Sequence, residues 1–219
     1  MDGWPLRMLE GIRILQADHR VFRFANAVDF EDMLSAMGFD PEDIDEMLGF
    51  LGETGDEFDG TRLLDAPFAP KPQLEARKIT PTRFSDGSLR VFYSSLESET
   101  AELEVVHWYA GAAVGSSRRV AYYHRLRCRF RGSAADLRAR ATDWPFLVGD
   151  GGQAYSRCQA LAREGVELNI AGFLTPSARR ASGTNVPVFR RQALSEPEIL
   201  GVAALSRRAE TGEVTVRRG

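Results

Sequence analysis

Four side chains in the sequence have the chemistry to hold and cleave a nucleotide: Arg83, Tyr93, Glu104 and Ser177. An arginine can bind a diphosphate through two parallel hydrogen bonds, and a tyrosine ring can stack on a flat heterocycle. A carboxylate can stabilise the cation that develops when a group leaves C1 of a ribose, and a serine hydroxyl can donate to a phosphate or an amide. Together these groups could break an N-glycosidic bond in a dinucleotide without a metal ion.

Taken one at a time, the same residues also fit structural roles. Arg83 could form a surface ion pair, Tyr93 could pack in the core, and Glu104 could lie on the solvated face of a helix. Ser177 could cap a turn or a helix. The chemical interpretation therefore depends on the four residues acting as one group.

A single stretch, residues 82–106, supplies three of the four residues. The arginine opens this stretch, and a turn is expected at residues 86–88, where Asp-Gly-Ser stands. A short apolar strand over 89–93 then ends at the tyrosine, and a helix over 98–108 carries the glutamate. We therefore expect a strand-turn-helix unit to deliver all three side chains.

The remaining elements are expected from periodicity and from the positions of glycine and proline. They are a helix over 5–18, a strand over 20–25, helices over 29–37 and 40–51, a loop over 52–72, a strand over 118–130, a helical turn over 136–141, a helix over 153–164, a strand over 166–171, a final helix from about 196 and an edge strand over 212–217. Because these elements follow no β-α-β period, the pattern favours an α+β fold with a mixed or antiparallel sheet over a doubly wound one. Neither a Gly-x-Gly-x-x-Gly motif after a strand nor a Gly-Lys-Ser/Thr loop occurs.

Charge is distributed unevenly along the chain. Residues 24–61 contain twelve acidic residues and neither lysine nor arginine, whereas the rest of the chain is rich in arginine. We interpret an acidic helical insertion at about 29–72, whose charge serves either as a solvated face or as a docking face for a partner. The arginines elsewhere suit an anionic ligand, because guanidinium groups bind phosphates and carboxylates in a forked geometry.

The composition and charge of the chain argue against several classes of protein. The net charge of −3 argues against general nucleic-acid binding, and no apolar stretch approaches the roughly 20 residues of a membrane span. The first sixteen residues do not resemble a signal peptide, so a cytoplasmic location is expected. Two cysteines and three scattered histidines provide neither a disulfide framework nor a metal site.

One signature in the strand-turn-helix unit resembles the RES-domain family, which is named for arginine, glutamate and serine. As in that family, Arg83 opens the unit, Tyr93 ends a short strand, and Glu104 follows eleven residues later. The early arginine of the family best matches Arg23, which follows a phenylalanine, and Arg20 is a competitor for that position.

A second signature of the same family lies near the end of the resemblance, which covers roughly residues 19–192. It is the run Pro-Ser-Ala-Arg over 176–179, followed by Gly183, Asn185 and an apolar strand. The chain departs from the family where Thr82 replaces a glycine.

The resemblance implies a single RES-type domain over residues 1–219, with a fold similar to ADP-ribosyltransferases, in which a split mixed or antiparallel sheet with flanking helices cradles NAD+. Members of the family are toxins of bacterial toxin–antitoxin pairs that consume NAD+ in the cytoplasm and inhibit growth. The implied partner is an antitoxin with a helix-turn-helix part and a C-terminal part that blocks the NAD+ cleft. No membrane and no direct nucleic-acid contact are expected.

The resemblance also implies a role for each site residue. Arg23 and Arg83 would hold the diphosphate and ribose, and Tyr93 would pack on the nicotinamide. Glu104 would stabilise the ribosyl cation. Positioning of the dinucleotide would fall to two further residues, Ser177 and Asn185.

The acceptor of ADP-ribose remains open. Glu102 and Glu104 match the Glu-x-Glu pattern of arginine-modifying ADP-ribosyltransferases, but on a helix two residues at this spacing point in different directions. We expect a protein target, which the acidic insertion could dock. The alternatives are an NAD+ glycohydrolase or phosphorylase and, in a different class, a non-enzymatic interaction module.

Overall fold

The computed structural model describes residues 7–27, 60–69, 81–112, 120–208 and 211–219. Its elements are β1 (Ile14–Asn26), α3 (Gly60–Asp65), β2 (Phe92–Ser95), α5 (Ser98–Ala112), β3 (Val120–Asp136), α6 (Gly152–Glu167), β4 (Gly172–Pro176), β5 (Thr184–Val188), β6 (Leu194–Arg207) and β7 (Val214–Arg218), with short 3-10 helices over Arg138–Arg140, Pro145–Leu147 and Arg191–Ala193. None of the helices in these ranges is both long and apolar enough to cross a membrane.

The strands form one mixed sheet whose pairings close on themselves. Their order is β1-β2-β5-β4-β3-β6-β7, and β1 also pairs with β3. Five strands therefore make a closed circuit, from which β6 and β7 extend as an antiparallel pair. Because only the β3–β4 pairing is parallel among these pairs, the sheet is mixed. The α+β class expected from the sequence is confirmed.

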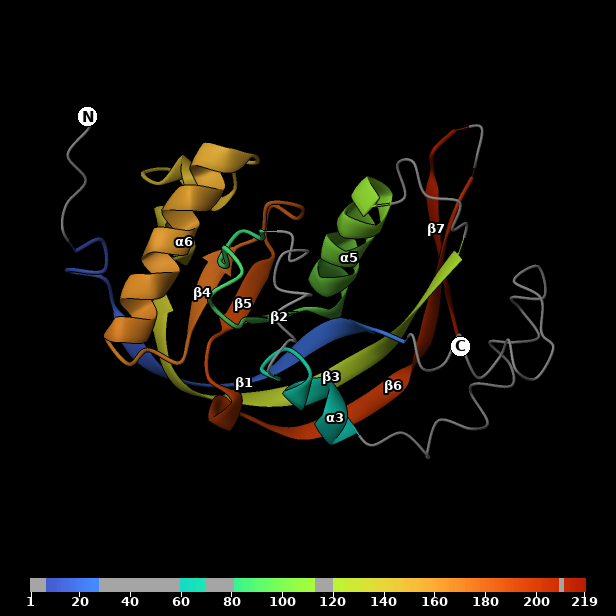
Figure 1. Cartoon of the computed structure of the whole chain (residues 1–219), viewed down its shortest axis with the longest axis horizontal. Helices are drawn as coiled ribbons and strands as arrows, with labels where there is room; N and C mark the ends of the chain where they lie inside the picture. The colour runs from blue at the N-terminus through green and yellow to red at the C-terminus, as the bar shows by residue number, and fades with distance from the viewer. Residues whose placement is uncertain (1–6, 28–59, 70–80, 113–119, 209–210) are drawn as a thin grey trace.

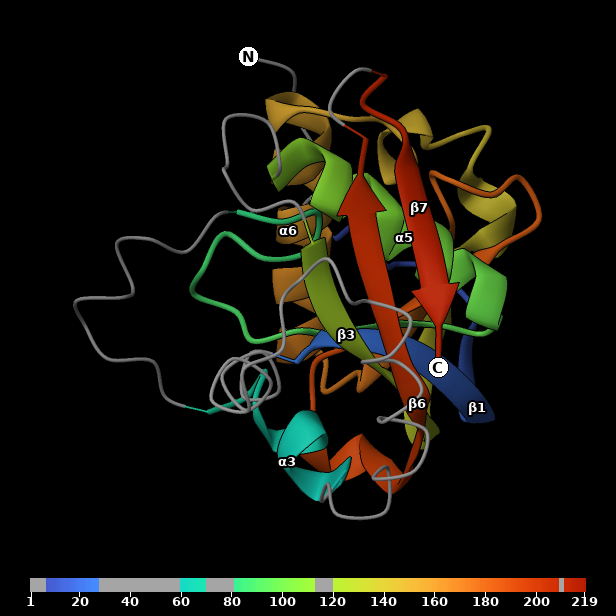
Figure 2. The ribbon, with the colours of Figure 1, turned by 90° about the vertical axis from the view of Figure 1, so that its right-hand side faces the viewer.

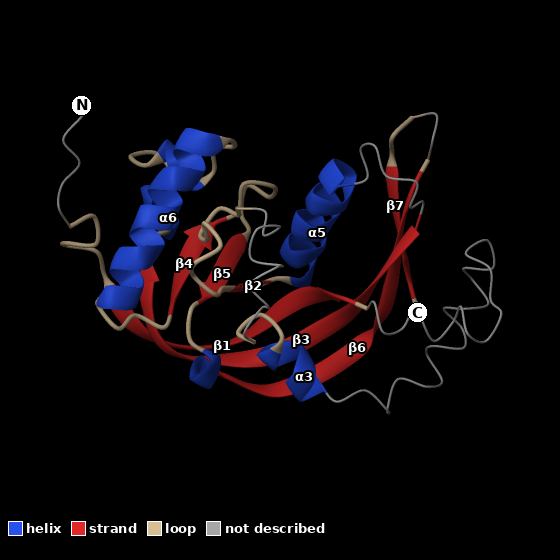
Figure 3. Ribbon diagram, viewed as in Figure 1, coloured by secondary structure: helices blue, strands red, loops and turns tan. Residues whose placement is uncertain are grey.

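The long strands β1, β3 and β6 lie side by side, with α5 and α6 on one face and α3 on the other (Figure 1). Figure 3 shows the same arrangement with helices and strands in separate colours. β3 is long because its side chains alternate over most of its length, with Tyr122, Leu126 and Phe130 buried on one parity. The predicted strand over 118–130 is thus confirmed from Val120 and continues further to Asp136.

Helix α6 packs against β4 through a stripe of small and apolar side chains. Cys158, Leu161, Ala162 and Gly165 are its buried residues, at the spacing of one helix face. A Cβ atom on the glycine would lie 2.7 Å from the ring of Phe173, so the helix approaches the strand closely there. The helix predicted over 153–164 is confirmed with slightly wider bounds.

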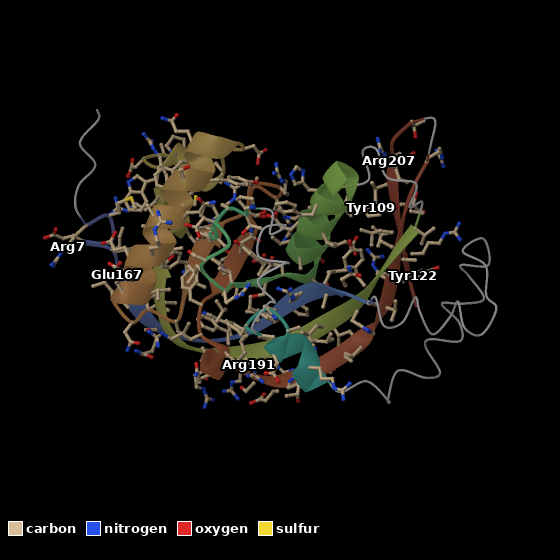
Figure 4. All side chains as sticks on the ribbon, in the orientation of Figure 1. Arg7, Tyr109, Tyr122, Glu167, Arg191 and Arg207 are labelled. Carbon is tan, nitrogen blue, oxygen red and sulfur yellow. The ribbon has the colours of Figure 1, made fainter. Side chains whose placement is uncertain are left out.

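Helix α5 lies beside β6 and β7 (Figure 2). Tyr109 of α5 is buried in a cluster with Ala121, Ala203 and Leu205 of the neighbouring strands (Figure 4). The helix predicted over 98–108 is confirmed, and this packing fixes which of its faces points into the molecule.

The helix predicted over 5–18 is wrong within the described residues. Gly11 adopts φ +73°, which ends the preceding turn, and a strand begins at Ile14. All thirteen residues of this strand pair with β3, from Ile14 opposite Ala135 to Asn26 opposite Tyr123. Long-range pairing therefore outweighed a local apolar spacing that also suited a helix. The strand predicted over 20–25 is confirmed as part of it.

The helix predicted from about residue 196 is also wrong, because β6 occupies Leu194–Arg207. Arg129 pairs with Ser195 and Arg127 with Glu198, so the two intervening residues of β6 form a bulge opposite a single residue of β3. Pro197 is tolerated at this bulge, where no ladder hydrogen bond is required of it. The edge strand predicted over 212–217 is confirmed as β7.

Three smaller predictions also differ from the structure. The strand predicted over 166–171 begins later, at Gly172, because α6 continues to Glu167. The strand predicted over 89–93 is displaced to β2. The loop predicted over 52–72 contains helix α3, and residues 29–59 and 70–72 of the proposed acidic insertion, with both helices predicted there, lie outside the described residues.

Candidate functional site

A pocket of about 320 Å³ lies where β1, β2, β5, α5 and α6 meet. Its lining includes five of the six predicted site residues: Arg23, Arg83, Tyr93, Glu104 and Asn185. The structure thus brings together side chains that the sequence separates by more than 160 positions.

The carboxylate of Glu104 is held by two donors from the other side of the pocket. Its Oε1 accepts a hydrogen bond from Ser177 Oγ at 2.8 Å and one from Asn185 Nδ2 at 2.6 Å. The amide of Asn185 is oriented in turn, because its Oδ1 accepts from Ser95 Oγ at 2.8 Å. These contacts fix one oxygen of the carboxylate; among the described residues, Oε2 accepts no hydrogen bond.

Ser177 lies behind the carboxylate and not in the pocket lining. It is 6% exposed, and its Oγ also accepts from the backbone N–H groups of Arg179 and Arg180 at 3.1 and 3.2 Å. The serine therefore has both roles considered from the sequence, since it caps a turn and contacts the candidate catalytic group.

Tyr93 lines the pocket with its ring while its hydroxyl holds the Arg83 loop. The Tyr93 hydroxyl lies 2.5 Å from Thr82 Oγ1, and it accepts from the backbone N–H of Phe84 at 3.0 Å. Burial raises the pKa of Tyr93 to about 12, so the phenol stays neutral at physiological pH. Its hydroxyl is therefore engaged in positioning the residues on either side of Arg83.

Arg83 is fixed by the loop that precedes α6. Its Nη1 donates to the Gly149 carbonyl at 2.6 Å, and its Nη2 donates to Asp150 Oδ1 at 3.3 Å. The guanidinium also lies over the ring of Tyr155, 5.1 Å from its centroid. Only 13% of the side chain is exposed, so the positive charge of Arg83 lies within the wall of the pocket.

Arg23 is the early arginine that reaches the pocket. Its Nη1 donates to the Tyr93 carbonyl at 3.0 Å and its guanidinium lies 4.7 Å from the centroid of the Phe92 ring. Burial lowers the pKa of Arg23 to about 10, which leaves it charged at neutral pH, and its buried Nε has no hydrogen-bond partner in the described part of the chain. Arg20 is instead exposed, with its closest carboxylate, Glu198, at 4.0 Å.

The two glutamates of the Glu-x-Glu pattern are not brought together. Glu102 binds Arg218 of β7 through contacts of 2.6 to 3.0 Å, whereas Glu104 faces the pocket. Because α5 is a helix, residues two positions apart point in different directions. The site therefore presents one of these carboxylates.

Three further residues near the pocket escaped the sequence analysis as site residues: Arg179, Asp150 and His107. Arg179 donates to both carboxylate oxygens of Asp150, and its Nη2 lies 2.7 Å from His107 Nε2. The arginine stands within the Pro-Ser-Ala-Arg run, which was a usable signal. The aspartate had none, because only the fold places residues 149–152 beside that run.

In the part of the chain that the structure describes, no group of three or more His, Cys, Asp or Glu side chains is placed to hold a metal ion. The candidate site is built from guanidinium, amide, hydroxyl and aromatic groups around one carboxylate.

Comparison with known families identifies the chain. The model of the RES domain matches residues 58–210. The chain belongs to the RES-domain family. The sequences of curated proteins gave no match. Among solved structures, the chain is similar to one in a crystal structure of the M. tuberculosis MbcT–MbcA toxin–antitoxin complex, with a TM-score of 0.45 and 14% identity over 85% of this chain and 86% of that one.

The matched RES domain contains most of the site but not all of it. Arg83, Glu104 and Asn185 lie inside the match, as do Tyr93 and Ser177. The strand β1 and its Arg23 precede the match, although β1 is paired along its whole length with a strand of the RES domain.

Proposed function

We propose that this RES-domain protein binds NAD+ in the pocket, cleaves the bond between nicotinamide and ribose, and acts as the toxin of a bacterial toxin–antitoxin pair. The observation that carries the proposal is the Glu104 carboxylate, which Ser177 and Asn185 hold at the edge of a pocket lined by arginines. Family membership supplies the class of reaction.

The positive groups of the pocket suit the diphosphate of NAD+. Arg83 and Arg23 both line the pocket with little exposure, and partial burial strengthens their attraction for phosphate oxygens. With its hydroxyl bonded to the Arg83 loop, Tyr93 offers its ring to the flat nicotinamide.

The charge of Glu104 suits the bond-breaking step. When the C1–N bond breaks, its electron pair moves to the ring nitrogen of nicotinamide and positive charge develops on the ribose. A carboxylate that two donors already orient stabilises that charge without reorganising. ADP-ribose then passes from the cation to an acceptor.

For the acceptor we propose a protein side chain, which makes the enzyme a mono-ADP-ribosyltransferase. The second candidate is water or phosphate, as in an NAD+ glycohydrolase or phosphorylase. It is favoured by the separation of Glu102 from the pocket, since the paired glutamates of the arginine-modifying pattern do not act together here.

We also propose that a cognate antitoxin covers the pocket in the cell, with the helix-turn-helix and cleft-blocking parts that the family resemblance implies. The protein is then cytoplasmic and NAD+ is its substrate, without a metal cofactor.

An NAD+ cleavage assay tests the main proposal. Purified wild-type protein is expected to release nicotinamide, and Glu104→Gln to lower the rate about a hundredfold to a thousandfold, the range found for removing one electrostatic stabiliser. Glu102→Gln is the matched control, since it neutralises a carboxylate two residues away that binds Arg218 outside the pocket. If NAD+ stays intact after incubation with folded wild-type protein that is free of antitoxin, the proposal is wrong.

Labelled NAD+ separates the acceptors. With biotin-labelled NAD+ and a bacterial lysate, a transferase leaves label on protein, whereas a glycohydrolase releases free ADP-ribose and a phosphorylase forms a phosphorylated product only when phosphate is present. Induced expression completes the test, because growth should stop with wild-type protein and continue with Glu104→Gln.

A further inference from the structure

A shared carboxylate joins two arginines at one side of the pocket. Asp150 Oδ1 accepts from Arg179 Nη2 at 2.6 Å and from Arg83 Nη2 at 3.3 Å, while its Oδ2 accepts from Arg179 Nη1 at 2.9 Å. Both arginines line the pocket. The cluster is therefore an anion, supplied by the protein, held between two cations of the site.

The Arg179 side chain is mostly buried in the wall of the pocket. Its side chain is 19% exposed, and its Nε is buried with no hydrogen-bond partner among the residues described. His107 Nε2 lies 2.7 Å from its Nη2 on another side. The guanidinium is thus oriented from two sides before any ligand arrives.

Asp150, by contrast, has a more exposed side chain that can move away from the two arginines. Its side chain is 55% exposed and stands at the end of the loop before α6. The next residue, Gly151, adopts φ +92°, a conformation that glycine reaches without strain. The carboxylate can therefore turn out to solvent while both arginines stay in place.

The chemistry of the two guanidinium groups matches a ligand with several anionic oxygens. Each can bind two oxygens of a phosphate in a forked geometry, and a diphosphate offers more oxygens and more charge than one carboxylate. Since both Arg83 and Arg179 are already bonded to Asp150, such a ligand and the aspartate require the same donors.

We propose that Arg179 binds the diphosphate of the substrate together with Arg83, and that Asp150 is an internal competitor for this position. The inference rests on the proposed function and deepens it, because it assigns a residue to substrate binding and a second residue to setting the affinity. Removing the charge of Asp150 then strengthens binding, whereas removing the fork of Arg179 weakens it.

Calorimetric titration with pyrophosphate, and separately with ADP-ribose, tests this on the full-length protein. Asp150→Asn is expected to bind both about twofold to fivefold more tightly, the range for releasing a partly exposed ion pair. Asp150→Glu, which keeps the charge, should stay close to wild type. Arg179→Gln should bind about tenfold more weakly or worse. Asp143→Asn is the matched control, since Asp143 pairs with Arg140 and neither lines the pocket.

Two results with these variants would overturn the inference. If Asp150→Asn binds the two probes no more tightly than wild type, the aspartate supports the arginines and does not compete with the ligand. Unchanged affinity in Arg179→Gln would remove the arginine from the binding site. If that variant does not fold, as judged by thermal unfolding, Arg179→Lys replaces it, because it keeps the charge but loses the fork and should also bind more weakly.

The proposed function fails in a different way. A wild-type protein that binds ADP-ribose with these shifts but leaves NAD+ intact overturns the reaction and keeps the binding cluster. A protein that cleaves NAD+ without these shifts keeps the reaction and overturns the cluster. Wild-type protein that binds neither probe overturns this inference directly.

Discussion

At the scale of single residues, the candidate catalytic carboxylate depends on a relay of hydrogen bonds. Ser95 orients the amide of Asn185, and the amide in turn holds Glu104. An asparagine can present either its oxygen or its nitrogen, and the Ser95 hydroxyl selects the orientation in which nitrogen faces the carboxylate. A serine outside the family signatures therefore contributes to the geometry of the site.

The first prediction at this scale concerns that serine. Ser95→Ala should lower kcat/KM for NAD+ by about twofold to tenfold, corresponding to the loss of one hydrogen bond that positions another group. Ser156→Ala is the control, because its exposed hydroxyl donates to the Gly152 carbonyl within α6, away from the site. A rate equal to wild type would mean that Asn185 keeps its orientation without Ser95.

A second prediction concerns the hydroxyl of Tyr93. Tyr93→Phe removes the hydroxyl that Thr82 Oγ1 and the Phe84 N–H both contact, so the free energy of unfolding should fall by about 1–3 kcal/mol. Denaturant titration measures this. In a double-mutant cycle, Thr82→Val and Tyr93→Phe should be less than additive, because both remove the same contact. Strict additivity would contradict the role assigned to the hydroxyl.

At the scale of elements, α6 and β4 make a close contact beside Phe84, the neighbour of Arg83 in the chain. Gly165 allows the approach, and the ring of Phe173 that it meets is fully buried. That ring is confined by edge-to-face contacts with Phe84 and Phe189, at centroid distances of 6.0 and 4.8 Å. The ring therefore has no space to yield to a larger residue on α6.

The prediction for this contact is that Gly165→Ala destabilises the protein. Alanine normally favours a helix over glycine by about 1 kcal/mol, but here the clash should outweigh that gain and leave a net loss of about 1–2 kcal/mol. Gly152→Ala is the control, since it meets nothing within 4 Å at the start of the same helix and should not lower the melting temperature. An increase for Gly165→Ala would show that the helix can shift.

Elements with strong local patterns were predictable, and those defined by distant partners were not. The alternation of β3, the face of α6 and the helix that carries Glu104 could all be found from the sequence. By contrast, the residues that form β1 also suited a helix, and a distant strand decided their structure. Likewise, Glu196-Pro197 resembles a helix start, but it lies in a bulge that only the pairing with β3 defines.

The same division applies to the candidate site. Five lining residues and Ser177 could be proposed because the family signatures contain them. Asp150 and Ser95 could not, because their importance depends on which backbone segments the fold brings together. The roles assigned to individual site residues stay predictions.

At the scale of the whole molecule, the N-terminal segment is part of the folded unit even though it precedes the family match. Glu164 of α6 accepts from the backbone N–H groups of Met8 and Leu9 at 2.8 and 3.0 Å. The strand that follows completes the circuit of five strands and carries Arg23 into the pocket.

A chain that begins at residue 58 should therefore not fold, although it retains the whole match to the RES domain. It would expose one entire edge of β3 and its buried side chains. Near-UV circular dichroism of the purified fragment is the measurement. A cooperative melt would instead show that the domain is smaller than residues 1–219.

Stability should also fall at alkaline pH. Burial raises the pKa of Cys158 to about 11 and that of Cys128 to about 12 from about 9, so folding favours the neutral thiols. Their contribution is complete below pH 9 and is lost as the pH rises through 11 to 12. The melting temperature of wild type should therefore drop more steeply above pH 9 than that of Cys158→Ala. Leu161→Val, a core change that does not titrate, should keep the wild-type slope.

The closed circuit of strands has a consequence for when the pocket can form during synthesis. β1 is made first, but its partner β3 ends at Asp136 and the circuit is completed only by β5, which reaches Val188. Such long loops close slowly and only after both ends exist. An emerging chain therefore holds Arg23 and Glu104 without a pocket until most of it has left the ribosome, and under the proposed function this delay would give an inhibitory partner time to be present before the first turnover.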